Sequence, residues 1–233
     1  MKHPIRTLVM SAACALTVSA PALAQTTTIK AGWAGIDPNS AASSISGPFT
    51  PTDALSLSVK RQSTLFFSVS REIDSDWDVE LALGAPPTHD VTVVVLNPAL
   101  VTPTVGAADG QVAATVRQIA PTLFANYWLS PKDSAVRPFV GVGVNYTSFD
   151  NASSTAVNNT VNGGPTSIKL SDSVGLALQL GVSVKLDGPW SLNAAWSTAQ
   201  VKTKMTTNTL GIERSADVSF KPSVLSLSVG YSF

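Results

Sequence analysis

The side chains that could do chemistry in this chain are few. Cys14 is the only cysteine and lies in the first 24 residues, so no thiolate nucleophile or thiolate metal site is expected beyond them. His89 is the only later histidine, and no serine or acidic residue stands at a spacing that marks a catalytic set with it. A surface position in a loop is the simpler interpretation of His89. The sequence therefore predicts no enzyme, no metal site and no cofactor.

The elements that would hold polar side chains are strands with one apolar face. From Leu225 to Phe233 every second residue is large and apolar, and the residues between are Ser or Gly. Alternate residues of a strand face opposite sides, so this segment has one apolar face and one face of small, mostly polar residues. Residues 173–186 and 139–146 repeat the pattern. A sheet that closes by pairing its last strand with its first would explain an apolar strand at the chain terminus.

Short and long connections alternate along the chain. Three short turns carry Asp, Gly, Pro or Ser, at 74–76, 130–134 and 187–189. Four long polar or Gly/Pro-rich stretches separate them, at 38–52, 86–113, 150–168 and 206–215. Seven connections join eight strands, which we expect at 26–37, 53–73, 77–85, 114–129, 137–149, 169–186, 190–205 and 216–233. The sequence thus predicts a single all-β domain over residues 25–233.

Composition favours a membrane setting for this sheet. Charged residues make up 13% of the chain, about half the ~25% usual for soluble proteins, and mean hydropathy is +0.22. A soluble barrel would turn its apolar face inward, but here the opposite face is mostly Ser, Gly, Ala and Asn, which suits a cramped barrel interior. The large aliphatic residues would then face lipid. No basic block is present, so nucleic acid is not an expected partner.

The first 24 residues have the order of a secretory signal peptide. Lys2 and Arg6 precede an apolar run, and Ala22-Leu23-Ala24 supplies a small-x-small cleavage site. A membrane anchor is the alternative, but the run is shorter than the ~20 residues that a spanning helix needs. Residues 1–24 are predicted to be removed, and residues 25–233 to form an eight-stranded antiparallel transmembrane β-barrel in the outer membrane. Short turns would be periplasmic and long loops extracellular.

Strand parity assigns a set of side chains to the barrel interior. Glu80 and Arg137 both begin strands after short turns, and we expect them to form an ion pair that closes the periplasmic end; the alternative is that each meets lumenal water. Phe124 and Trp128 would form an apolar constriction or simply fill the core. The candidates for the lumen lining are Glu80, Ala82, Phe124, Asn126, Trp128, Arg137, Gln179, Asn193 and Ser197.

Two groups of apolar residues lie outside this set. Trp77, Trp190, Tyr231 and Phe233 cluster at the short-turn ends of strands, which favours an aromatic belt at the membrane interface over ordinary core packing. Residues 91–108 are unusually apolar for a loop. They are interpreted as a β-hairpin that extends the barrel wall above the membrane. The alternative is a loop that folds over the mouth of the barrel and collects hydrophobic solutes.

Six short segments occur in a recognisable order along the chain: 37–38 (DP), 79–81 (VEL), 120–123 (APTL), 137–147 (RPFVGVGVNYT), 170–173 (LSDS) and 229–233 (VGYSF). Through these segments the chain resembles the outer-membrane protein W (OmpW) family of Gram-negative bacteria over nearly all of residues 25–233. It departs from the family pattern where Val174 replaces a usual Trp and where Ser223 follows Lys221-Pro222 in place of an aromatic.

This resemblance implies a narrow, partly apolar channel for passive passage of small, mainly hydrophobic molecules. A plugged structural or receptor barrel, which binds bacteriocin or phage through its loops or serves in stress, is the alternative. Expected partners are outer-membrane lipids and lipopolysaccharide, small hydrophobic solutes, and the barrel-assembly machinery, which would engage the C-terminal strand ending in Phe233.

Overall fold

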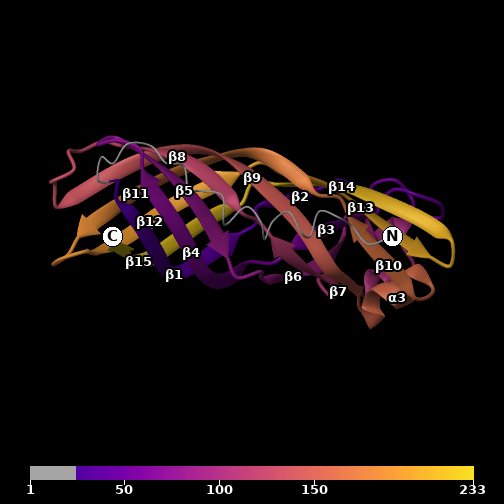
Figure 1. Cartoon of the computed structure of the whole chain (residues 1–233). Helices are drawn as coiled ribbons and strands as arrows, with labels where there is room; N and C mark the ends of the chain where they lie inside the picture. The colour runs from indigo at the N-terminus through magenta and orange to yellow at the C-terminus, as the bar shows by residue number, and fades with distance from the viewer. Residues whose placement is uncertain (1–24) are drawn as a thin grey trace.

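The computed structural model describes residues 25–233, and a closed antiparallel barrel forms one half of its length (Figure 1). The signal peptide expected at 1–24 lies outside the described residues. The wall runs in the order β11-β12-β15-β1-β4-β5-β8-β9, and β9 pairs with β11 to close the ring. The eight wall strands are β1 (Thr27–Asp37), β4 (Gln62–Glu72), β5 (Trp77–Gly84), β8 (Thr122–Trp128), β9 (Val136–Ser154), β11 (Ser173–Lys185), β12 (Trp190–Ala199) and β15 (Ser223–Ser232).

Closure joins the two ends of the chain. The last strand, β15, pairs with β1 from Thr28↔Ser232 to Asp37↔Ser223, and it pairs with β12 on its other side. Every strand of the wall therefore has two neighbours, as backbone groups in hydrocarbon require. The all-β fold with eight antiparallel strands predicted from the alternating connections is confirmed.

The large aliphatic side chains lie on the outside of this wall. On β11, Val174 is 70% exposed whereas Ala177 is 2% exposed, and the same alternation continues through Leu178 and Gln179. Strand pleating produces this division because the side chains have a period of two. The barrel thus presents an apolar outer surface and an interior of small and polar residues.

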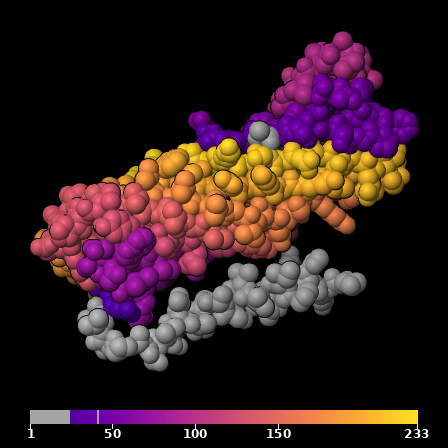
Figure 2. Space-filling view, turned by 90° about the horizontal axis from the view of Figure 1, so that it is seen from above, coloured from indigo at the N-terminus to yellow at the C-terminus, as the bar shows by residue number. Residues whose placement is uncertain are grey.

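A second layer of strands extends the barrel at the end opposite to the short turns. This layer is called the upper layer. One sheet contains β3 (Leu55–Val59), β6 (Thr88–Val95), β7 (Val112–Ile119) and the far end of β9. The other contains β10 (Thr166–Leu170), β13 (Val201–Thr209), β14 (Ile212–Phe220) and β2 (Ser40–Ala42). Figure 2 shows the elongated body that results, with a lobe of violet and magenta segments at one end. Short helices η2 (Pro98–Leu100), α2 (Pro103–Gly106) and α3 (Ala156–Asn162) complete the layer.

This layer corrects two expectations about the connections. Residues 206–215 are mostly strand, and residues 86–113 contain β6, η2, α2 and the start of β7, so neither segment is an open loop; β6 and β7 form the hairpin wall expected for part of 91–108. Several predicted long strands are also interrupted, and Pro121 and Pro222 lie at two of the breaks. Proline has no N–H to give to a ladder, so these residues end the barrel strand and let the chain change sheets.

The two upper sheets share an apolar core. Leu57, Val91 and Val116 from one sheet pack with Met205 and Val218 from the other. Among residues 25–233, no helix has the length and apolar character needed to cross a bilayer.

Candidate functional site

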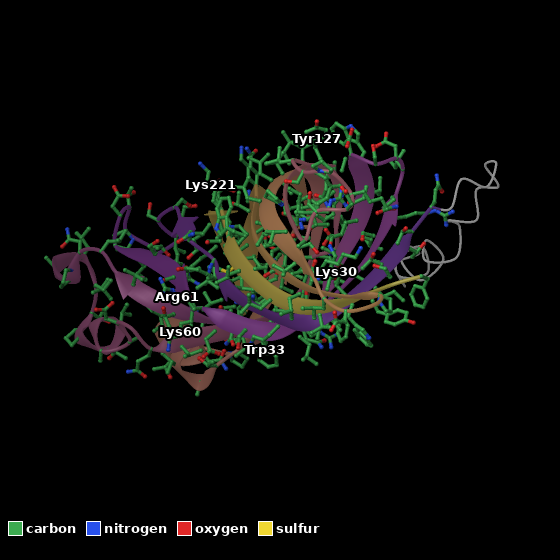
Figure 3. The ribbon with its side chains drawn as sticks, turned by 90° about the vertical axis from the view of Figure 1, so that its left-hand side faces the viewer. Lys30, Trp33, Lys60, Arg61, Tyr127 and Lys221 are labelled. Atoms are coloured by element: carbon green, nitrogen blue, oxygen red, sulfur yellow. The ribbon has the colours of Figure 1, made fainter. Side chains whose placement is uncertain are left out.

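The middle of the barrel contains a buried ion pair. Lys30 Nζ on β1 lies 2.9 Å from Glu80 Oε1 on β5, and the two residues are 4% and 2% exposed. Ser68 on β4 donates a hydrogen bond to the same carboxylate oxygen at 2.5 Å. In Figure 3 the Lys30 side chain lies inside the barrel, surrounded by wall strands.

Further hydrogen bonds extend this pair across the barrel. Asn126 Nδ2 donates to Asp78 Oδ1 at 2.9 Å and to Glu80 Oε2 at 3.0 Å. Gln179 Nε2 on β11 also donates to Glu80 Oε2, at 3.0 Å. Together these residues form a polar barrier, which is defined here as Lys30, Ser68, Asp78, Glu80, Asn126 and Gln179.

Glycine on β9 makes room for the barrier. A Cβ at Gly141 would lie 2.2 Å from Asn126 Oδ1, and one at Gly143 would lie 2.4 Å from the Leu123 carbonyl oxygen. The Gly-x-Gly spacing in this strand therefore allows close packing against β8, with the Asn126 side chain at one glycine and the Leu123 backbone at the other.

The expected Glu80–Arg137 ion pair is wrong. Arg137 instead donates to the carbonyl oxygens of Ser75 and Ser130, at 2.9 and 3.3 Å, and its guanidinium lies 4.4 Å from the centre of the Trp128 ring. The strand register explains the difference. Phe124 on β8 pairs with Glu80 on one side and with Gly143 of β9 on the other, so Glu80 is level with Gly143. Arg137 lies six residues before Gly143 on β9, too far along the strand to reach Glu80. Sequence reasoning missed Lys30. The signal was present, because Lys30 shares one face of β1 with the small residues Gly32 and Ala34, and small residues mark the interior face.

The other residues predicted to line the lumen lie at different levels of the barrel. Phe124, Ala82 and Ser197 line a cavity above the polar barrier, together with Gln179. Trp128, Arg137 and Asn193 line a cavity below it. Trp128 Nε1 donates to Asp78 Oδ2 at 2.9 Å, so its ring belongs to the lower side.

Four cavities follow the long axis of the molecule. The lower cavity, of about 290 Å³, is polar and is lined by Lys30, Asp78 and Arg137. The barrel cavity, of about 120 Å³, is largely apolar and lies above the barrier. Of the described residues, none lines both. The polar barrier therefore separates the interior into two compartments.

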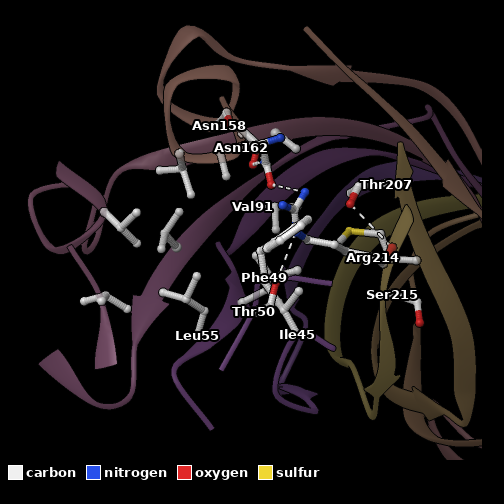
Figure 4. A pocket seen from close by; sticks show the side chains of 18 of the residues that line it. Ile45, Phe49, Thr50, Leu55, Val91, Asn158, Asn162, Thr207, Arg214 and Ser215 are labelled. Carbon is white, nitrogen blue, oxygen red and sulfur yellow. Dashed lines mark hydrogen bonds between the residues drawn. The ribbon is translucent and has the colours of Figure 1, made fainter. Parts of the chain in front are cut away.

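Two further cavities continue the barrel cavity upward. The neck, of about 40 Å³, shares Ile36, Gln118 and Pro222 with the barrel cavity. It shares Val91 with the upper cavity, which measures about 210 Å³ and lies between the two upper sheets. Figure 4 shows this upper cavity, with Leu55 among its apolar side chains and Arg214 beside Thr50 and Asn162 at its polar edge. The barrel cavity, the neck and the upper cavity thus follow one another along the molecule, with shared lining residues between successive cavities.

The barrel wall has a gap beside the barrel cavity. The ladder between β5 and β8 ends at the pair Ala82↔Thr122, and the next backbone bond joins Gln118 N to Pro87 O at 3.0 Å. In the described chain, residues 83–86 and 119–121 exchange no backbone hydrogen bond, and two of these positions are prolines. Leu83, Gly84 and Ala120 on its two edges all line the barrel cavity. This gap is called the side window.

The OmpW family model matches residues 25–233, the whole described chain. The chain belongs to the OmpW family. Outer membrane protein W of Vibrio cholerae is 29% identical over 166 residues, which cover 69% of this chain and 76% of that protein. Outer membrane protein W of Salmonella typhimurium is 35% identical over 127 residues, 54% of this chain and 58% of that protein. The resemblance inferred from the sequence motifs is confirmed.

Solved structures agree with the OmpW assignment. The crystal structure of the outer membrane protein OprG from Pseudomonas aeruginosa has a TM-score of 0.78 and 28% identity, and the match covers 89% of this chain and 95% of that one. AlkL in lipid bilayers matches with a TM-score of 0.62 at 20% identity, with 88% and 90% of the two chains covered, so it shares the fold. This OmpW-family chain is an outer-membrane barrel protein, as its alternating strands predicted.

His89 of this OmpW-family chain is buried on β6 of the upper layer, and not in a surface loop as expected from the sequence. It is 5% exposed and lines the neck, where Nδ1 lies 3.3 Å from the Lys60 carbonyl oxygen. Within residues 25–233 its Nε2 has no hydrogen-bond partner. Burial lowers the pKa of the imidazole, and the Lys60 carbonyl, Gln118 and Asp90 oppose that shift only in part.

The four aromatic residues expected to form a belt lie at the short-turn end. The Trp77 ring is 5.1 Å from that of Tyr127, and the Trp190 and Phe233 rings are each 4.9 Å from Tyr231. Trp77, Trp190 and Phe233 are exposed on the outer surface of the barrel. No group of three His, Asp or Glu side chains placed to hold a metal occurs within residues 25–233.

Proposed function

We propose that this protein lets small, mainly hydrophobic molecules enter from the cell exterior and leave sideways into the outer membrane. The upper cavity, the neck and the barrel cavity would form the path, and the side window would be its exit. No covalent step is part of this function. The polar barrier carries the proposal, since it makes onward movement toward the periplasm unfavourable for an apolar molecule.

Energetics favour the sideways exit. An apolar solute in the barrel cavity is surrounded by Phe66, Phe124 and Val224, and burial of its surface there gains about 25 cal/mol per Å². Downward passage would require it to separate Lys30 from Glu80, and a buried charge without its partner is strongly unfavourable. Passage through the side window exchanges one apolar environment for another, so it has no such cost.

The experiment that tests this is uptake of a hydrophobic dye into liposomes by the folded protein. Gly84 edges the side window, and a Cβ there would meet only Thr64 Cγ2 at 3.4 Å and the Leu65 oxygen at 3.8 Å. Gly84→Phe therefore fits the backbone and places a ring in the opening. We expect it to reduce uptake at least several-fold.

Gly35→Phe is the matched control, since Gly35 is exposed on the wall and a Cβ there meets nothing within 4 Å. Equal uptake by the two variants would refute the side exit. The polar barrier also implies very low ion conductance in a planar bilayer, and a steady large conductance would contradict a closed lumen.

A receptor role is a second candidate, because apolar side chains stand at loop tips. Phe49 and Leu210 are exposed, and both have positive φ angles, of 58° and 52°. Non-glycine residues in this conformation are uncommon, and they are often found at functional sites. Binding of a bacteriocin or phage that is lost in Leu210→Ala, with dye uptake intact, would favour this role, since Leu210 lines none of the four cavities.

The remaining partners follow from the outer surface. Outer-membrane lipids and lipopolysaccharide would surround the aliphatic face of the wall, with the Trp77 and Trp190 rings at the periplasmic interface. The barrel-assembly machinery would engage β15 through its end at Phe233, and slower assembly of Phe233→Ala in cells would support that contact.

A further inference from the structure

The upper cavity is lined by one charged side chain. Arg214 projects into it from β14, and the other lining residues are apolar or uncharged. Figure 4 shows the guanidinium between Thr50 and Asn162, facing the apolar side chains across the cavity. A lone cation in such surroundings lacks the counter-charge that half-buried charges usually have.

The contacts of Arg214 leave part of its hydrogen-bonding capacity unused. Nε donates to Thr50 Oγ1 at 3.0 Å, and Nη1 donates to Asn162 Oδ1 at 3.3 Å. A guanidinium has five N–H groups, so these bonds occupy two of them. Both acceptors are neutral. No carboxylate lies within ion-pair distance of Arg214 among residues 25–233.

Three acidic side chains of the same layer have other partners, and none of the described Asp or Glu residues lines the upper cavity. Asp150 forms an ion pair with Arg117 at 2.7 Å, and Asp53 accepts a hydrogen bond from Ser44 at 2.9 Å. Asp109 accepts from the backbone N–H of Val95 at 2.8 Å. These groups are engaged in holding loops and strands, so the charge of Arg214 is available to a ligand.

We propose that the upper cavity takes amphiphiles with an anionic head, such as medium-chain carboxylates, and orients them with the head on Arg214. This rests on the proposed function and names the solute class of that path. The planar fork of the guanidinium matches a carboxylate and forms short, charge-assisted bonds with it. The alkyl chain would lie among Leu55, Val93 and Val101, which line the same cavity.

The head group decides between this class and its alternatives. A neutral alcohol of equal chain length fills the same apolar space but leaves the guanidinium charge unpaired. A quaternary ammonium of equal length places like charges together, which is unfavourable. Carboxylate, alcohol and ammonium ligands with one chain length therefore separate the contribution of the charge from that of the chain.

Met205 provides a direct reporter of cavity occupancy. It lines the upper cavity, and it is the only methionine after residue 24. A ¹³C-methyl label on methionine thus gives a single cavity signal within residues 25–233. The experiment titrates the folded protein in lipid nanodiscs with decanoate, decanol and decyltrimethylammonium, and follows the Met205 methyl resonance.

We expect decanoate to bind roughly tenfold more tightly than decanol, and the ammonium to bind most weakly; tenfold is what one half-exposed charged hydrogen bond would supply. Arg214→Gln should abolish the preference for decanoate, and Arg214→Lys should retain part of it. Lys204→Gln is the matched control, because it removes an exposed cation one residue from Met205 that does not line the cavity.

The outcomes distinguish this inference from the function on which it rests. Equal binding of decanoate and decanol to the native protein overturns the anionic preference and leaves the apolar path standing. Equal weakening of both ligands by Arg214→Gln overturns it also, since Arg214 would then act only on cavity shape. If no ligand shifts Met205, the cavity binds no such solute and both proposals fail.

Discussion

Lys30 and Glu80 are 50 residues apart in the chain, yet they form a 2.9 Å ion pair inside the barrel, and the pair holds two non-adjacent wall strands to a common centre. β1 and β5 are separated by β4, which contributes Ser68 to the same carboxylate. Three strands thus converge on one group. This convergence makes the barrier part of the packing of the wall as well as the division between the two interior cavities.

Removal of Lys30 should destabilise the barrel strongly. Lys30→Met leaves the Glu80 carboxylate buried without its cation, which costs about 3–5 kcal/mol. We expect the folded band on unheated electrophoresis to disappear at a lower urea concentration than for the native protein. The double variant Lys30→Met/Glu80→Gln should recover much of the loss, because no unpaired charge remains.

The control for this change is Arg61→Met. Arg61 forms an ion pair with Asp37 at 2.6 Å, but its side chain is 81% exposed. Exposed pairs contribute ~0–1 kcal/mol, so this variant should resemble the native protein. Equal sensitivity of Arg61→Met and Lys30→Met to urea would show that the buried Lys30–Glu80 pair contributes no more to stability than the exposed Arg61–Asp37 pair.

The stability of the upper layer should fall in mild acid because of His89. Burial lowers the pKa of this histidine below its value in an unfolded chain, near 6.5. Between those two pKa values the unfolded chain binds more protons, so the free energy of unfolding rises with pH across this window. His89 therefore adds stability that is complete above about pH 6.5 and decreases as pH falls below it.

The measurement is the urea midpoint at pH 7.5 and at pH 5. His89 is the only histidine after residue 24, so a difference between the two values can be assigned by His89→Gln, which should remove it. A midpoint that is the same at both pH values in the native protein would contradict this assignment.

Close packing of the wall makes Gly175 sensitive to the smallest side chain. A Cβ at Gly175 on β11 would lie 1.7 Å from the backbone carbonyl oxygen of Gln200, the residue between β12 and β13. Gly175→Ala must displace one strand, with an expected cost of about 1–3 kcal/mol or more. Refolding yield in detergent measures this effect. Gly35→Ala, which meets nothing within 4 Å, should refold as the native protein does.

Strand number and wall orientation could be predicted because both depend on local patterns. Alternation along residues 173–186 assigned Gln179 to the interior, and the short turns fixed the strand count. Contacts across the barrel could not be predicted in this way. The partner of Glu80 depends on register among three strands, and parity says only that a residue faces inward, so Arg137 was chosen where Lys30 stands.

The upper layer was harder to predict for a related reason. Residues 86–113 are apolar, Pro-rich and Gly-containing, and the same composition suits a loop or a hairpin. Tertiary packing decides the outcome, since β6 is strand only because β3 and β7 pair with it. The prediction that His89 lies in a surface loop was wrong for the same reason, because the burial of His89 depends on the pairing of β6 with β3 and β7.

The length of β9 determines how far above the bilayer the protein would first contact a solute. This strand has 19 residues, and a tilted strand crosses hydrocarbon with about 9–11. Almost half of β9 therefore rises past the acyl chains, to the height of head groups and sugars. Under the proposed function, an oily compound would meet apolar side chains at that height, and so it would not need to dissolve in the hydrated carbohydrate layer before reaching the bilayer.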